Sequence, residues 1–145
     1  MDFNFVKLAQ SLINALQFGS FYALIALGYS MVYSILMLFN FAHGDIFMVG
    51  SYIAFGIATW LLSLAWLPMP GWMVMIVTIL GSMLFTALIG VIVERVGYRP
   101  LREAPRASAA ITGLMIGIIL ETGVLAIVGG QRIGFPRLIP IEVYK

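Results

Sequence analysis

Residues 72–93 read WMVMIVTILGSMLFTALIGVIV, an apolar run that contains no charged side chain and stops at Glu94 and Arg95. A helix needs about 20 apolar residues to cross the hydrocarbon core of a membrane, and this run has that length. Three further windows also meet the requirement: roughly 18–38 after an amphipathic lead-in at 5–17, 45–66, and 108–128. The sequence therefore predicts an all-α, polytopic membrane protein with about four transmembrane helices.

The overall composition agrees with these four windows. Of the 145 residues, 62% are hydrophobic and only 10% are charged, whereas a soluble domain carries about 25% charged residues. We therefore expect the surface of the protein to face the lipid membrane, which is its predicted partner. The net charge of +2 does not indicate a nucleic-acid partner, because half of the basic residues fall in one short segment between apolar runs.

That segment contains four arginines, which are Arg95, Arg99, Arg102 and Arg106. Because positive charge marks cytoplasmic loops, we expect this loop in the cytoplasm, the uncharged turn at 68–71 outside, and both chain ends outside. The Asn40–Asp45 turn then lies on the cytoplasmic side or dips into the membrane. The spacing of the arginines would also suit a docking surface on a helix, but Pro100 and Pro105 interrupt such a helix, which favours the topological interpretation.

The sequence offers little for catalysis. It has no cysteine and only two lysines, Lys7 and Lys145, so a P-loop for ATP is excluded. His43 is the only histidine, and its spacing of two from Asp45 does not place both side chains on one helix face. We therefore expect no enzymatic activity, no metal site and no cofactor in this chain.

The most polar interruption of the first two windows is Asn40-Phe41-Ala42-His43-Gly44-Asp45. In one interpretation Asp45 caps the second helix and His43 lies at the headgroup interface. In the other, the segment is a broken helix at membrane depth, tolerated because it lines a polar cavity, with Gly44 allowing the backbone to turn. The second interpretation makes Asn40, His43, Gly44 and Asp45 candidates for a substrate pathway.

Glu121 lies inside the fourth apolar window, where an unpaired charge costs about 2.5 to 3.5 kcal/mol on insertion scales. We expect it to be neutral, paired or facing water. One interpretation makes it a pathway or proton site, and the other a protonated carboxyl bonded to Thr112, Thr122 or a neighbouring subunit.

Small residues at helical spacing predict close helix contacts. Gly113 and Gly117 form a GxxxG step, and Gly50, Ala54 and Ala58 form a row on one helix face. Packing against a neighbouring helix is the favoured interpretation over a dedicated dimer motif.

Several motifs together resemble a known family, the LivH-type permease subunits of branched-chain amino acid ABC importers. These motifs, in the family's order, are Asn14, GSFYALIALGYSMVY at 19–33, NFAHGD at 40–45, Glu94-Arg95, and YRPLR at 98–102. The resemblance implies a multi-pass permease of the bacterial inner membrane that forms part of the pathway for a branched-chain or related amino acid. It also gives the broken-helix interpretation of residues 40–45 as much weight as the interfacial one.

The resemblance further implies partners: a second permease subunit, two cytoplasmic ATPase subunits that bind the ATP, and a periplasmic amino-acid-binding protein. Family members are about twice as long, so the chain, one transmembrane permease domain over 1–145, resembles their N-terminal half. Glu121 stands where the family has uncharged polar residues, and the sequence does not identify the amino acid carried. The alternative function is a small homo-oligomeric channel or proton-coupled transporter that uses Glu121.

Overall fold

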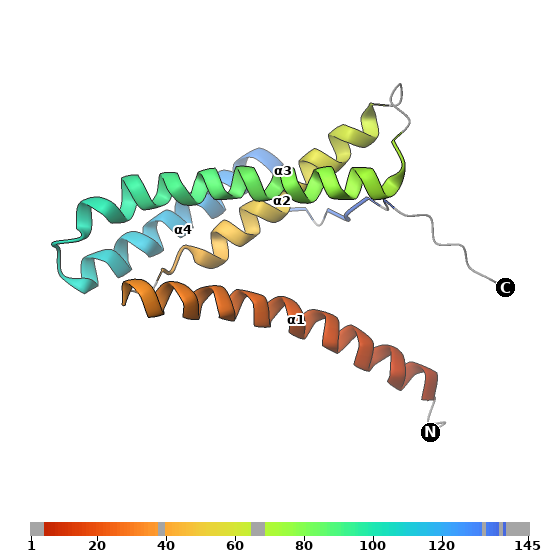
Figure 1. Ribbon diagram of the computed structural model, residues 1–145, viewed down its shortest axis with the longest axis horizontal. Coiled ribbons are helices and arrows are strands. Elements are labelled where there is room, and N and C mark those ends of the chain that lie inside the picture. Colours follow the sequence, from red (N-terminus) through yellow and green to blue (C-terminus); the bar gives the residue numbers. More distant parts are fainter. Residues whose placement is uncertain (1–4, 38–39, 65–68, 132, 137, 139–145) are drawn as a thin grey trace.

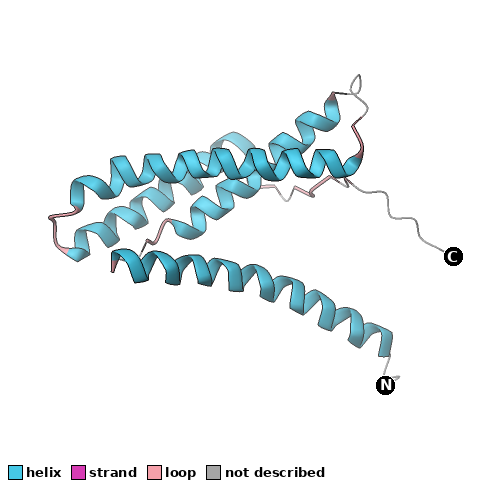
Figure 2. Cartoon of the chain, in the orientation of Figure 1, coloured by secondary structure: helices cyan, strands magenta, loops and turns pink. Residues whose placement is uncertain are grey.

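The computed structural model describes residues 5–37, 40–64, 69–131, 133–136 and 138. Within these ranges the regular structure is entirely helical, with no strand (Figure 2). Four long α-helices follow one another: α1 Phe5–Leu36, α2 His43–Ser63, α3 Gly71–Ile92 and α4 Arg106–Val128. Each of the four is long and apolar enough to cross a membrane. The predicted all-α fold with four membrane-spanning helices is therefore confirmed.

The bounds of α1 differ from the prediction. The helix begins at Phe5 and runs without interruption to Leu36, so residues 5–17 are its first half and not a separate lead-in. Polar side chains continue the helix there, since Gln10 donates a hydrogen bond of 3.1 Å to Asn14 one turn later. At 1.5 Å per residue, 32 residues measure about 48 Å, which exceeds the hydrocarbon thickness of about 30 Å.

The connection between α3 and α4 changes helix type twice. A π-helical turn, η1 at Val93–Tyr98, continues α3 and is followed by a 3₁₀ turn, η2 at Arg99–Leu101. Pro105 then precedes the first residue of α4. The chain thus leaves the α-helical path before Pro100, and the four arginines do not share one regular helix face. The carboxylate of Glu94 pairs with the guanidinium of Arg102 at 3.0 Å on the protein surface.

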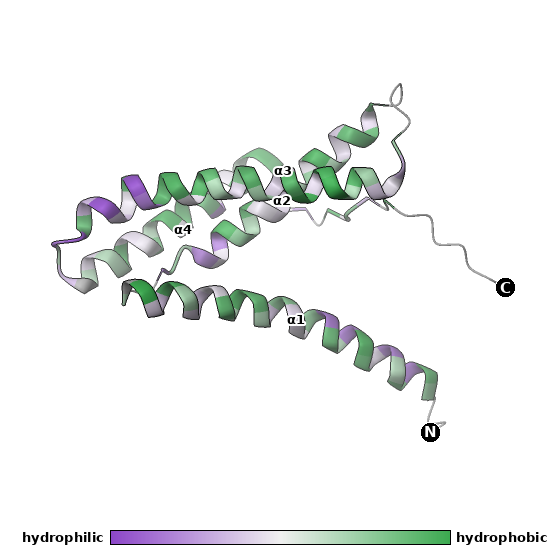
Figure 3. Ribbon diagram, viewed as in Figure 1, coloured by the Kyte–Doolittle hydropathy of each residue, from purple (hydrophilic) through white to green (hydrophobic). Residues whose placement is uncertain are grey.

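Three of the helices pack together, and α1 diverges from them. α2 packs along α3 and also contacts α4. The C-terminal end of α1 contacts α2, and the N-terminal end of α1 lies away from the other helices (Figure 1). The buried positions lie in or next to α2, α3, η1 and α4: Ala42 just before α2, Ala58, Leu61, Val74, Thr78, Val93, Ala109, Gly113 and Gly117. Most large apolar side chains are exposed instead, including many along α1, which suits a surface that faces lipid or other helices (Figure 3).

Candidate functional site

The chain between α1 and α2 makes a sharp break in the helical path. α1 ends at Leu36, and Met37 has a φ of 51°, the only non-glycine residue in the described ranges with a positive φ. Such a left-handed conformation costs a non-glycine residue about 1–2 kcal/mol, so surrounding contacts must hold it. α2 then begins at His43. We refer to Asn40–Asp45 as the junction.

Each of the two interpretations of the junction contains one detail that this geometry corrects. The broken-helix interpretation gave the turn to Gly44, but Gly44 lies in the first turn of α2 without a positive φ, and a Cβ added to it would meet open space. The interfacial interpretation made Asp45 the cap of α2, but the cap position is Ala42 and no side chain caps it. Asp45 instead sits in the first turn of α2, where the helix dipole stabilises a negative charge.

The side chain of Asn40 holds the junction together. Its oxygen Oδ1 accepts a hydrogen bond from the Ala42 backbone N–H at 3.1 Å, and the phenol of Tyr98 donates a second one at 2.7 Å. The backbone carbonyl of Asn40 accepts the N–H of His43 at 3.1 Å. One asparagine therefore shapes the turn before α2 and ties it to the end of η1.

His43 packs against α1 instead of facing open solvent. Its ring meets the ring of Tyr29 edge-on, with centroids 5.1 Å apart, and the hydroxyl of Tyr29 lies 3.4 Å from the Phe41 carbonyl oxygen. A Cβ added to Gly28 would collide with the imidazole of His43. The absence of a side chain at Gly28 therefore allows the imidazole to lie against α1.

On its other side, the junction packs into the small-residue face of α4. Gly113 and Gly117 are both buried. A Cβ at Gly113 would lie 2.5 Å from the Tyr98 hydroxyl and 3.3 Å from the Phe41 nitrogen, and one at Gly117 would collide with the Asp45 carboxylate. Gly117 has eleven residues of α4 on either side, since α4 spans 106–128. Asp45 thus lies beside the middle of α4.

The structure brings some of the predicted residues together and separates others. Asn40, His43, Asp45, Gly113 and Gly117 meet around the junction. The other predicted packing residues lie along α2, where a Cβ added to Gly50 would lie 2.8 Å from the Thr86 hydroxyl of α3 and where Ala54 is half-buried. The arginine segment lies at the far end of α3 and the start of α4.

Three residues of the site were not predicted from the sequence: Gly28, Tyr29 and Tyr98. All three lie within motifs that the sequence analysis quoted, at 19–33 and 98–102, so the motifs were the available signal. Their contacts depend on how α1, η1 and the junction meet in space.

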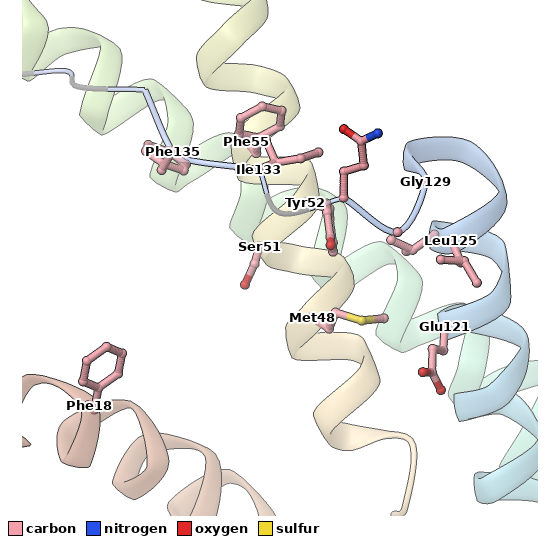
Figure 4. Close-up of a pocket in the computed structure, with 13 residues that line it drawn as sticks. Phe18, Met48, Ser51, Tyr52, Phe55, Glu121, Leu125, Gly129, Ile133 and Phe135 are labelled. Carbon is pink, nitrogen blue, oxygen red and sulfur yellow. The ribbon is translucent and has the colours of Figure 1, made fainter.

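Glu121 lies one helical turn beyond Gly117 and lines a groove of about 1040 Å³ between α2, the end of α4 and the segment that follows α4. In Figure 4, Glu121 projects from α4 next to α2, which contributes Met48, Ser51, Tyr52 and Phe55, while Phe18 reaches the groove from α1. The rings of Phe55 and Phe135 meet edge-on with centroids 6.4 Å apart, which fixes the following segment against α2. The hydrogen bonds of Glu121 to Thr112 or Thr122, which one of the two interpretations proposed, are not formed between these described residues.

These arrangements suit solute binding better than chemistry on a substrate. In the described part of the chain no three His, Cys, Asp or Glu residues gather closely enough to hold a metal ion. The junction offers hydrogen-bonding groups and the carboxylate of Asp45. The groove offers apolar surface and the carboxylate of Glu121. Such groups can bind and orient a small solute.

Comparison with known proteins identifies the family to which the chain is similar. The model of a family described as branched-chain amino acid transport system / permease component matches residues 11–137. The chain is 40% identical over 131 residues to the high-affinity branched-chain amino acid transport system permease protein BraD of Pseudomonas aeruginosa, covering 90% of this chain and 42% of that protein. It is 36% identical over 138 residues to the corresponding permease protein LivH of Escherichia coli, covering 95% of this chain and 44% of that protein.

A LivH protein of Salmonella typhimurium is likewise 36% identical, over 142 residues. The chain therefore spans less than half the length of the curated relatives it matches. These relatives are transport permeases and not enzymes. No solved structure matches the chain.

Proposed function

Because the chain belongs to the family of branched-chain amino acid transport permease components, we propose that it is a transmembrane permease component of an ABC importer for branched-chain or related amino acids. In this proposal the chain lies in the bacterial inner membrane and forms part of the substrate pathway. Its partners are a second permease subunit, two cytoplasmic ATPase subunits that bind ATP, and a periplasmic amino-acid-binding protein.

One observation carries the assignment of the pathway to particular residues. The helical path breaks between α1 and α2, and the polar junction residues lie beside Gly117 in the middle of α4. Interrupted backbone at membrane depth is tolerated where it is buried in protein or lines a water-filled cavity. The junction therefore fits the inner part of a solute path, with Asn40, His43 and Asp45 as its polar groups.

The groove at Glu121 extends this path along α4. It begins one helical turn beyond Gly117, on the side of the junction away from the arginine segment. With the arginine segment in the cytoplasm, as the positive-inside rule predicts, the groove belongs to the outer half of the chain. A solute delivered from the periplasm would meet the groove first and the junction second.

Reconstitution of transport tests this function. The chain is placed in vesicles alone and together with the proposed second permease, ATPases and binding protein, and uptake of radiolabelled leucine, isoleucine and valine is measured with and without ATP. We expect ATP-dependent uptake only in the complete set. Leucine flux through the chain alone, driven by a proton or solute gradient, would instead support the homo-oligomeric channel or proton-coupled transporter.

A further inference from the structure

Glu121 is the one carboxylate among the described residues that line a mostly apolar groove. It makes no hydrogen bond or ion pair with any described residue, and its neighbours along the groove include Met48, Phe55 and Leu125. A charge in such surroundings is costly unless a group of opposite charge or water accompanies it. An ionised Glu121 in this groove therefore needs a positively charged group or water beside it.

The described arginines, at the end of α3 and the start of α4, are too far away to meet this need. Glu121 lies fifteen residues beyond Arg106, the first residue of α4, which corresponds to about 22 Å along the helix axis. The cations of the η1 and η2 segment lie at that same far end of α4. No described residue therefore supplies the positive charge, and Arg132 and Arg137 lie outside the described residues.

The rest of the lining selects the chemical class of the ligand. Aromatic and aliphatic side chains dominate, and Tyr52 and Gln131 add a hydroxyl and an amide that can donate hydrogen bonds. An aliphatic amino acid presents the complementary groups: an ammonium, a carboxylate and an apolar side chain. The volume of about 1040 Å³ is large enough to admit such a ligand with some of its water.

We propose that this groove is an amino-acid subsite in which the Glu121 carboxylate binds the ammonium group and the aliphatic side chain packs against α2. Tyr52 and Gln131 then face the ligand's carboxylate. The inference rests on the proposed transport function and specifies which group of the substrate this chain recognises. It gives Glu121 a binding role, not a proton-coupling role.

Ligands that lack one charged group test the assignment without any mutation. Leucine, 3-methylbutylamine and 4-methylpentanoate share the same branched side chain, but the second lacks the carboxylate and the third lacks the ammonium. Their binding to the full chain in lipid nanodiscs is measured by equilibrium dialysis. We expect leucine and 3-methylbutylamine to bind at least about tenfold more tightly than 4-methylpentanoate, because charge-assisted hydrogen bonds are the stronger ones.

Variants then assign the effect to one side chain. Glu121→Gln should weaken binding of leucine and 3-methylbutylamine at least about tenfold and leave 4-methylpentanoate unchanged, while Glu121→Asp should retain part of the preference for the amine. Glu94→Gln, which removes a carboxylate outside the groove, is the matched control and should bind as the wild type does. The thermal midpoint of each variant shows that it is folded.

Failure of this inference differs from failure of the transport function. Equal binding of the amine and 4-methylpentanoate, absence of binding to the wild type, or unchanged amine binding by folded Glu121→Gln would each overturn the subsite. Uptake by the complete system would still stand in those cases. Conversely, amine-selective binding without ATP-dependent uptake would retain the subsite and reject the importer.

Discussion

The phenol of Tyr98 donates a 2.7 Å hydrogen bond to the side chain of Asn40, a residue 58 positions earlier in the chain. The same Asn40 oxygen accepts the Ala42 N–H that shapes the start of α2. This bond therefore joins the π-helical end of α3 to the break between α1 and α2. It makes the junction a tertiary structure and not a local turn alone.

Loss of this bond should lower stability by a small, measurable amount. Tyr98→Phe removes one neutral hydrogen bond and should reduce the free energy of unfolding in detergent by about 1 kcal/mol. Asn40→Ala should cost more, because it also leaves the Ala42 N–H without its acceptor. Tyr22→Phe, at an exposed tyrosine of α1, is the control, and a loss for Tyr98→Phe no larger than the control's would contradict the coupling.

Alanine at the glycines of α4 should separate packing from helix propensity. Gly117→Ala and Gly113→Ala introduce a Cβ against Asp45 and against Tyr98, and overpacking of this kind costs about 1–3 kcal/mol. At Gly123, on the same helix, an added Cβ meets open space. Gly123→Ala should therefore be neutral or stabilising by up to about 1 kcal/mol. Denaturant titration measures all three, and equal effects would refute the contact with the junction.

The contact of His43 with α1 predicts a contrast between two other glycines. Gly28→Ala should displace the imidazole, whereas Gly44→Ala should leave it in place because its Cβ meets no atom. Modification of His43, the only histidine, by diethylpyrocarbonate reports its exposure. We expect faster modification in Gly28→Ala than in the wild type and an unchanged rate in Gly44→Ala. Identical rates in all three proteins would disprove the role of Gly28.

The orientation of the helices is testable in the natural cysteine-free background. Single cysteines are placed at two exposed residues: Pro70, just before α3, and Glu103, in the connection between η2 and α4. In intact cells, a membrane-impermeant maleimide should label the cysteine at Pro70 and should reach the one at Glu103 only after permeabilisation. Labelling in the opposite order would place the arginine segment outside.

The surface ion pair should contribute little. Glu94 and Arg102 lie 3.0 Å apart with exposed fractions of 45% and 70%, and exposed pairs are worth about 0–1 kcal/mol. Glu94→Gln should therefore shift the unfolding free energy by less than about 1 kcal/mol at low salt and by less still at high salt. A larger shift would show that the pair is shielded by other chains.

Much of the fold could be predicted from the sequence, because each apolar window has about the length that a helix needs to cross the membrane. The windows near 45–66, 72–93 and 108–128 correspond to α2, α3 and α4, and the resemblance to the permease family is confirmed. The start of α1 was missed because Gln10 and Asn14 lower its hydropathy, although their hydrogen bond along the helix continues it. The end of the window at 45–66 and the start of the turn expected at 68–71 fall on residues 65–68, which lie outside the described residues.

The candidate site was only partly predictable, for a physical reason. The junction residues were singled out as polar groups among apolar ones, and Gly113 and Gly117 as small ones, but nothing local indicates that they meet. Their contacts depend on where α2 starts relative to α4, and that depends on the break at Met37 and on Tyr98. Met37 carries no turn signal, because a left-handed φ is typical of glycine or asparagine and not of methionine.

Because of the π-helical turn at Val93–Tyr98, the contacts of the junction depend on the number of residues in that turn. A π turn accommodates one residue more than an α-helix needs over the same stretch, and each residue of an α-helix turns the side-chain direction by about 100°. Removing one residue from this turn would let α3 continue as an ordinary helix and would point residue 98 away from Asn40. In evolutionary terms, a single-residue insertion or deletion here alters the junction while leaving every residue of α2 and α4 unchanged.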